Sequence, residues 1–237
     1  MAANGRLTVA AILVAAGSGE RLRAGVPKAF VPVGGQSLLA RALAIFAGHS
    51  AVDHLVVVAP QSHLSEAAEL SRAAVVPGGA TRQASVAAGL AALPADVGFV
   101  LVHDVARPFV PAAVIDAVVA ALAAGADAVV PVVPIHDTVR AVDADGRLAG
   151  VIDRATLAAM QTPQGFRRDV LVRAHQRAGA VVATDDAALV EALGLEVAAV
   201  PGDERAFKVT TPLDLAYAET IAGLLSAPHP PVPGGIS

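Results

Sequence analysis

The chain contains no cysteine and no tryptophan, and aromatic residues make up only 3% of its 237 positions. Without cysteine it has no disulfides, thiol catalysis or cysteine metal sites, which is compatible with the reducing cytoplasm in which we expect the protein to act. The formal net charge of -4 and the scarcity of aromatics disfavour a nucleic-acid partner. The apolar run at about 7–16 is too short to span a bilayer, which takes about 20 residues, so we expect no membrane association.

Apolar residues nevertheless form 55% of the chain, and their pattern predicts a two-sided α/β fold. Continuous apolar runs are typical of strands covered on both faces, and they are expected at 7–14, 55–59, 73–76, 99–103, 128–133 and 195–200. Helix-length segments separate them, at 37–46, 62–72, 81–93, 111–124, 168–178, 184–193 and 212–225. This alternation predicts a doubly wound, mostly parallel, Rossmann-like sheet.

One segment departs from the alternation and predicts a protruding β-arm at about 134–154. It contains the turn signal Asp143–Gly146, which is typical of a hairpin. We expect residues 1–225 to form a single domain that carries this arm. The Pro- and Gly-rich residues 226–237 predict a disordered tail.

The stretch "LVAAGSGERLRAGVPKAF" at 13–30 places glycines directly after a predicted strand and cations soon afterwards. Exposed N–H groups in a strand-to-helix turn attract phosphate, and glycine allows close approach. The P-loop pattern is missing, and the dinucleotide fingerprint has Leu22 in place of its third glycine. Arg21 and Lys28 instead suit a triphosphate lying on the loop.

A second candidate cluster, "VLVHDVARPFV", places Asp104 just past another apolar strand and Arg107 three residues later. Ligands of open α/β sheets bind beyond the carboxyl ends of the strands, where both clusters are expected. A carboxylate there suits Mg²⁺ or another divalent cation, which binds one or two protein oxygens together with substrate phosphates.

Seven motifs in order, over about residues 8–225, resemble the sugar nucleotidyltransferases, most closely the 2-C-methyl-D-erythritol 4-phosphate cytidylyltransferase family. They are "AAGSGERL…PKAF", "GGATRQASVAAGL", "HDVARPFV", "HDTV", "DRATLAAMQTPQGF", "TDDAALVE" and "FKVTTPLDLAYAE". The resemblance implies CTP and methylerythritol phosphate as substrates, and a homodimer in which the arm of each subunit reaches the other's site. Ala80 departs from some relatives, which carry an aspartate that contacts the nucleotide.

The resemblance also implies a role for each matching residue. The implied catalytic residues are Arg21, Lys28 and Lys208. The implied nucleotide-binding residues are Ala15, Ala16, Gly17, Gly79 and Ser85. The implied substrate-binding residues are Arg107, Thr138, Arg154, Thr162 and Thr184, and the implied metal ligand is Asp104. For Ser85, Thr184 and Lys208 the alternatives are a mid-helix serine, an N-cap and a solvated lysine.

The expected reaction explains why these residues include cations and a carboxylate but no obvious base. A phosphate monoester has a second pKa of about 6, so a sugar phosphate already carries its nucleophilic oxygen ionised at neutral pH. A cytidylyltransferase for another polyol phosphate, such as ribitol 5-phosphate, is the alternative within the same chemistry. A nucleotide-binding protein without catalysis is the alternative from another class.

Overall fold

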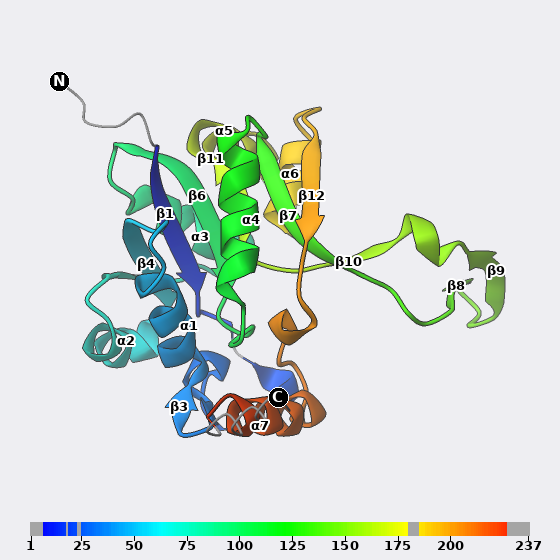
Figure 1. Cartoon of the computed structure of the whole chain (residues 1–237), viewed down its shortest axis with the longest axis horizontal. Coiled ribbons are helices and arrows are strands. Elements are labelled where there is room, and N and C mark those ends of the chain that lie inside the picture. The colour runs from blue at the N-terminus through cyan, green and yellow to red at the C-terminus, as the bar shows by residue number, and fades with distance from the viewer. Residues whose placement is uncertain (1–6, 18, 23–24, 180–184, 227–237) are drawn as a thin grey trace, which may run out of the picture.

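The computed structural model describes residues 7–17, 19–22, 25–179 and 185–226 (Figure 1). Its centre is an eight-stranded sheet with the order β10-β7-β11-β6-β1-β4-β5, in which β12 pairs with β7. The bounds are β1 Thr8–Val14, β4 His54–Ala59, β5 Ala74–Pro77, β6 Val97–Asp104, β7 Ala128–Pro134, β10 Ala158–Met160, β11 Gln164–Arg167 and β12 Val197–Pro201. The predicted strands at 7–14, 55–59, 73–76, 99–103, 128–133 and 195–200 all form.

Helices cover both faces of this sheet. They are α1 Leu38–Ala47, α2 Leu64–Leu70, α3 Arg82–Ala91, α4 Ala112–Ala123, α5 Arg168–Ala178, α6 Asp186–Glu191 and α7 Pro212–Ser226. Successive residues of β1 face opposite sides, so Leu13 packs with Phe46 of α1 and Ile115 of α4, whereas Ile12 packs with Val86 of α3 and Leu171 of α5. The doubly wound, mostly parallel fold is confirmed, because β1, β4, β5 and β6 pair in parallel and β1, β4 and β6 are buried on both faces.

An antiparallel pair of strands was not expected from the sequence. β11 inserts between β6 and β7 and runs antiparallel to both, and β10 pairs antiparallel with β7. Gly165 allows the insertion, since a Cβ there would lie 2.4 Å from Cγ1 of Val118. The chain therefore leaves the sheet after β7 and returns through β10 and β11.

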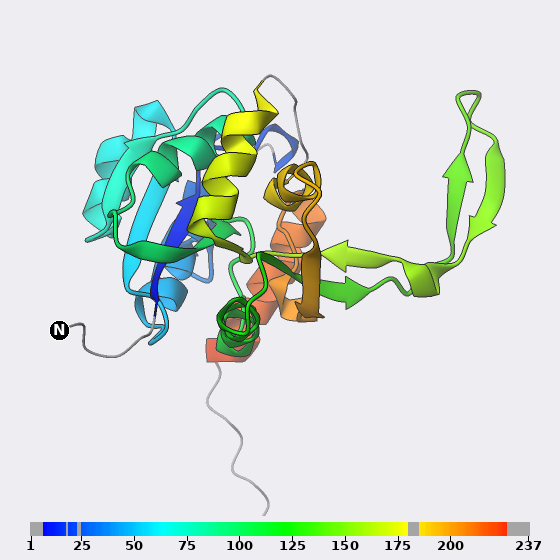
Figure 2. The ribbon, with the colours of Figure 1, turned by 90° about the horizontal axis from the view of Figure 1, so that it is seen from above.

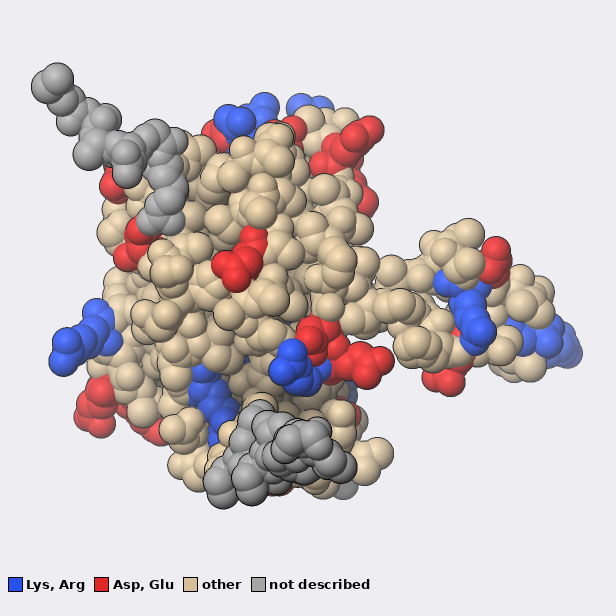
Figure 3. All heavy atoms as spheres, in the orientation of Figure 1, with Lys and Arg blue, Asp and Glu red and all other residues tan. Residues whose placement is uncertain are grey.

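Between these strands the chain forms the predicted arm, which projects from the body of the molecule (Figure 2). Its hairpin pairs β8 Val139–Val142 with β9 Leu148–Ile152, and Gly146 adopts φ +79° in the turn. Both acidic and basic side chains appear on the arm surface (Figure 3). Val142, Leu148 and Val151 are also 60–69% exposed, so the arm presents apolar side chains away from any core of its own chain.

A smaller layer lies at the carboxyl end of the sheet. β2 Pro32–Val33 and β3 Gln36–Ser37 form a short hairpin, and α7 packs on it through Ala218 and Ala222. In the part of the chain that the structure describes, no helix is both long and apolar enough to cross a membrane. The predicted tail at 226–237 begins one residue too early, because Ser226 is the last residue of α7. Residues 227–237 and the expected helix start at Thr184 lie outside the described residues.

Candidate active site

A cavity of about 700 Å³ opens beyond the carboxyl ends of β1 and β6. Its walls come from the glycine loop after β1, the loop between β5 and α3, the end of β6 and the segment before α7. Nine of the residues singled out from the sequence line it: Ala15, Ala16, Gly17, Arg21, Lys28, Gly79, Ser85, Asp104 and Lys208. The fold thus brings together residues separated by nearly 200 positions.

Close packing of glycines shapes this cavity. Gly19 has φ +68°, and a Cβ built on it would lie 2.5 Å from Cβ of Lys28. A Cβ on Gly78 would lie 2.2 Å from Cβ of Ala16. Glycine is therefore required at both positions, because any side chain would push Lys28 or the β5–α3 loop out of place.

Ser85, singled out as a nucleotide-binding residue, has a structural role in this conformation. Its side chain is buried, and its hydroxyl donates to the carbonyl of Thr81 at 2.9 Å. The same oxygen accepts from the N–H of Gly79 at 3.1 Å. Ser85 therefore ties the glycine-containing loop to the first turn of α3, and contact with a nucleotide stays a prediction.

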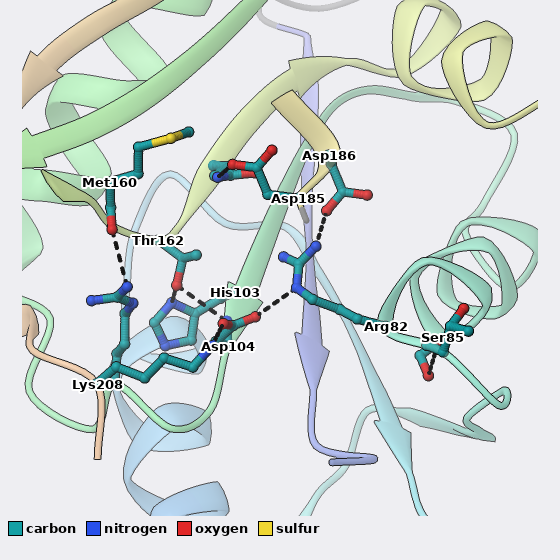
Figure 4. Close-up of polar contacts among 12 residues, drawn as sticks. Arg82, Ser85, His103, Asp104, Met160, Thr162, Asp185, Asp186 and Lys208 are labelled. Atoms are coloured by element: carbon teal, nitrogen blue, oxygen red, sulfur yellow. Dashed lines mark hydrogen bonds and ion pairs between the residues drawn. The ribbon is translucent and has the colours of Figure 1, made fainter. Parts of the chain in front are cut away.

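Asp104 occupies the last position of β6 and is held by two cations. Nε of Arg82 donates to its Oδ1 at 3.1 Å, and Nζ of Lys208 donates to its Oδ2 at 2.6 Å (Figure 4). Burial alone would raise the pKa of Asp104, but the charges of Arg82 and Lys208 outweigh burial and hold the pKa well below its usual range. The carboxylate is thus ionised at neutral pH.

The Lys28 ammonium lies in a different electrostatic setting. Burial, assisted by repulsion from the positive charge of Lys208, lowers the pKa of Lys28 to about 8. The nearby carboxylate of Asp104 opposes this shift without cancelling it. An anion placed between Lys28 and Lys208 would relieve their repulsion, so this wall of the cavity is suited to phosphate.

Two further candidates, Thr162 and Arg107, lie near the cavity but do not line it. The Thr162 hydroxyl accepts from the N–H of Asp104 at 3.1 Å and lies 3.0 Å from Nδ1 of His103. His103 is fully buried, and burial lowers its pKa to about 3, so the ring is neutral. Arg107 donates to the carbonyls of Ala206 at 2.6 Å and Met160 at 3.1 Å. Thr162 supports the end of β6, and Arg107 ties the loop after β6 to β10 and to the segment at Ala206. Substrate contact by either residue stays a prediction.

Thr138 and Arg154 lie on the arm, not on the cavity wall of their own chain (Figure 1). Both residues are exposed, and Nη1 of Arg154 donates to the carbonyl of His136. Thr184 lies outside the described residues. The arm residues therefore do not contribute to the cavity of their own chain in this structure, and substrate contact by Thr138 and Arg154 stays a prediction.

The sequence reasoning missed Arg82, which lines the cavity at the first position of α3. Besides Asp104 it contacts Asp186, which accepts from its Nη1 at 2.6 Å. Asp186 in turn lies 2.9 Å from Nε2 of His175. Arg82 and Asp186 both lie in motifs quoted from the sequence. The pattern that could have identified Arg82 is an arginine at the start of a helix that follows a Gly-Gly loop.

The residues present fit a divalent cation that is bound mainly by substrate phosphates. Asp104 contributes an ionised carboxylate at the cavity wall, and Mg²⁺ commonly takes one or two such ligands and completes its shell with phosphates and water. Among the described residues no group of three or more metal-ligating side chains occurs. A site made by protein side chains alone is therefore not formed by this part of the chain.

Comparisons with known proteins agree with this geometry. The family model described as 2-C-methyl-D-erythritol 4-phosphate cytidylyltransferase matches residues 9–223. A protein of that name from Streptomyces coelicolor is 50% identical over 229 residues, covering 90% of this chain and 84% of the relative. A bifunctional enzyme IspD/IspF from Clavibacter michiganensis is 51% identical, and the chain spans 53% of its length.

Solved structures give the same result. The crystal structure of 2-C-methyl-D-erythritol 4-phosphate cytidylyltransferase from Thermus thermophilus is 41% identical with a TM-score of 0.76, covering 90% of this chain and 98% of that one. A 4-diphosphocytidyl-2C-methyl-D-erythritol synthase from Anaerococcus prevotii superposes with a TM-score of 0.80 at 27% identity. The order of the motifs, the fold and the matched length agree, and the chain belongs to the 2-C-methyl-D-erythritol 4-phosphate cytidylyltransferase family.

Proposed function

We propose that this protein transfers CMP from CTP to 2-C-methyl-D-erythritol 4-phosphate. The products are 4-diphosphocytidyl-2-C-methylerythritol and pyrophosphate, within the non-mevalonate isoprenoid pathway. The observation that carries this proposal is that one cavity is lined by the glycine loop together with Arg21, Lys28, Asp104 and Lys208. Family membership supports the choice of substrates.

The transfer is an in-line displacement at phosphorus. A phosphate oxygen of the sugar phosphate attacks the α-phosphorus of CTP, a new P–O bond forms, and the bond to the β-phosphate bridging oxygen breaks. The electron pair leaves with pyrophosphate. Because the attacking phosphate is already largely dianionic at neutral pH, no side chain has to remove a proton. The protein must instead hold two polyanions together in line.

The described side chains supply this positioning. Arg21 and Lys28 would bind the phosphates that lie on the glycine loop, where leaving pyrophosphate accumulates negative charge. Lys208 would move from Asp104 toward the α-phosphate and stabilise charge there. Asp104 would hold Mg²⁺, which when bound neutralises phosphate oxygens. Preorganised charges in a cavity of this kind lower the barrier without any covalent step.

We also propose a cytoplasmic homodimer whose arms complete the partner's substrate site with Thr138 and Arg154. The arm hairpin has two strands, and an isolated two-stranded hairpin is marginal in water, so it needs a surface to pack on. Its exposed Val142, Leu148 and Val151 supply apolar area for this contact. In a homodimer with a two-fold axis, each arm would pack on the other subunit, so both arms would bury their apolar area in the same way.

The test is pyrophosphate release on mixing the purified protein with Mg²⁺, CTP and methylerythritol phosphate. Ribitol 5-phosphate in place of methylerythritol phosphate tests the alternative substrate. ATP in place of CTP tests the preference for the cytosine base of the nucleotide. The proposal predicts turnover with the first pair and far lower rates with either replacement. Release of pyrophosphate only with ribitol 5-phosphate would transfer the assignment to that substrate. Binding of CTP without release under all these conditions would indicate a nucleotide-binding protein.

A further inference from the structure

The side chain of Arg82 joins two carboxylates (Figure 4). Nε of Arg82 donates to Oδ1 of Asp104 at 3.1 Å, and Nη1 donates to Oδ2 of Asp186 at 2.6 Å. Asp186 is 1% exposed, and its other oxygen, Oδ1, lies 2.9 Å from Nε2 of His175. Through these contacts the wall of the nucleotide cavity is connected to α5 and α6 on one face of the sheet.

The four groups that Arg82, Asp104, Asp186 and Lys208 contribute are two cations and two carboxylates joined by direct contacts, and Lys28 adds a further positive charge near Asp104. The shorter contact of Arg82 is the one to Asp186, which is also the more deeply buried acid. Attraction between opposite charges grows as distance and solvent exposure fall, so Asp186 takes a large part of the charge of Arg82. Asp104 is less neutralised than it would be beside an arginine with no second partner.

We propose that Asp186 is a positioning residue that holds Arg82 between two carboxylates and so leaves Asp104 enough negative charge to bind a divalent cation together with the nucleotide phosphates. The inference rests on the proposed function for the identity of the nucleotide. It goes further because it places the control of cation affinity in a buried acid that does not line the cavity. His175 anchors the remaining oxygen of Asp186 and fixes the direction in which that carboxylate faces Arg82.

The experiment is calorimetric titration of CTP into the purified full-length protein at a series of Mg²⁺ concentrations, with no sugar phosphate, so that no transfer occurs. The quantity compared is the Mg²⁺ concentration that gives half of the maximal gain in CTP affinity. In Asp186→Asn, Arg82 turns its whole charge to Asp104, so this concentration is expected to rise about 10-fold, as is typical when the partner of a metal-site residue is lost. Thermal unfolding of the same samples reports whether the fold is kept.

Two further variants separate this role from a merely structural one. Asp185→Asn alters the neighbouring side chain, whose carboxylate accepts from the N–H of Ala188 at the start of α6 and from Gln164 rather than from Arg82. It is expected to leave the Mg²⁺ requirement unchanged. In an Arg82→Gln background, Asp186→Asn is expected to add nothing further, because Asp186 acts through Arg82.

Three results would overturn the inference: CTP affinity that does not depend on Mg²⁺ in the wild type, an unchanged Mg²⁺ requirement in folded Asp186→Asn, or an equal rise in the Arg82→Gln background. If Asp186→Asn does not fold, His175→Ala replaces it. That variant removes the contact that fixes the direction of Asp186 toward Arg82, so the Mg²⁺ requirement is expected to rise, and an unchanged requirement would contradict the proposal. Absence of pyrophosphate release by the wild type would refute the proposed function alone, since these titrations involve no turnover.

Discussion

Nζ of Lys208 lies 2.6 Å from Oδ2 of Asp104, although 104 positions separate the two residues in the chain. The contact joins the end of β6 to the segment that precedes α7 and places both side chains on one wall of the cavity. It also means that the carboxylate and the ammonium hold each other in place before any ligand arrives. Under the proposed function, phosphates in the cavity would compete with Asp104 for Lys208, so ligand binding would change this pair.

Asp104→Asn is expected to abolish most turnover while the fold survives. Asparagine keeps the shape of the side chain and one of its two acceptor oxygens, but it loses the second acceptor and the charge that would hold Mg²⁺. Pyrophosphate release at increasing Mg²⁺ concentration measures the effect, and circular dichroism checks the fold. An unchanged response to Mg²⁺ in this variant would place the metal elsewhere.

Arg21→Ala and Lys28→Ala are each expected to reduce turnover about 10²- to 10³-fold, because each removes one preorganised charge from the transition state. Neither side chain belongs to the hydrophobic core, so the melting temperature should change little by comparison. Steady-state rates and thermal unfolding measured on the same preparations separate the two effects. Near-normal turnover in either variant would refute its assigned role.

The lowered pKa of Lys28 predicts opposite effects of pH on binding and on stability. As the pH rises through about 8, Lys28 in the free protein loses its charge, so CTP affinity should weaken in the wild type but not in Lys28→Met. The unfolded chain keeps the ordinary lysine pKa and binds the proton more tightly, so this group raises the free energy of unfolding as the pH increases from about 8 to about 10.5.

Lys28→Met should consequently unfold at a higher temperature than the wild type at pH 7, because burial of the charged ammonium is unfavourable there. The difference should shrink as the pH rises toward 10, where the wild-type lysine is neutral in the folded protein. Calorimetric unfolding at pH 7 and pH 10 tests this sign. A variant that is less stable than the wild type at pH 7 would contradict the account.

Gly19→Ala and Gly25→Ala form a matched pair. Both glycines adopt a positive φ, +68° and +74°, so alanine at either position costs roughly 1–2 kcal/mol of stability. A Cβ at 19 would also lie 2.5 Å from Cβ of Lys28, whereas a Cβ at 25 meets nothing within 4 Å. We expect a loss in melting temperature in both variants, larger in Gly19→Ala, and a further loss of turnover of about 10- to 100-fold in Gly19→Ala alone, because Lys28 is displaced. Equal activity of the two variants would show that this contact does not position Lys28.

A mixing experiment tests the shared site. Lys28→Ala and Arg154→Ala are each expected to be nearly inactive, and activity should return in part when the two are mixed and exchange subunits. One of the two sites in the mixed dimer then draws an intact Lys28 from one chain and an intact Arg154 from the other. Sedimentation of the protein as a monomer, or no recovery after demonstrated exchange, would exclude the shared site.

The α/β layers followed from local patterns in the sequence. The runs at 7–14 and 99–103 are apolar except at Thr8 and His103, as is typical of strands covered on both faces, and the structure forms β1 and β6 there. The arm could also be predicted from the sequence, because Asp143–Gly146 is a strong turn signal between two short strands. These features depend on neighbours within a few residues, so the sequence alone determined them.

The insertion of β11 between β6 and β7 was decided by tertiary structure. The segment 164–167 is short and carries no alternation that distinguishes it from a loop, and its place in the sheet depends on Gly165 accommodating Val118 and Leu122 of α4. Strand order is a property of which surfaces pack together, and no local pattern records it.

The candidate active site was likewise determined in part by the sequence and in part by the tertiary structure. The sequence determined which residue types the chemistry needs and, through the motif order, that Arg21, Lys28, Asp104 and Lys208 belong to one site. Only the tertiary structure decided that Lys208 and Arg82 both bind Asp104, and that Asp186 and His175 support Arg82 from behind. These contacts join residues 11 to 104 positions apart in the chain, and the strength of each depends on burial and distance, which exist only once the chain has folded.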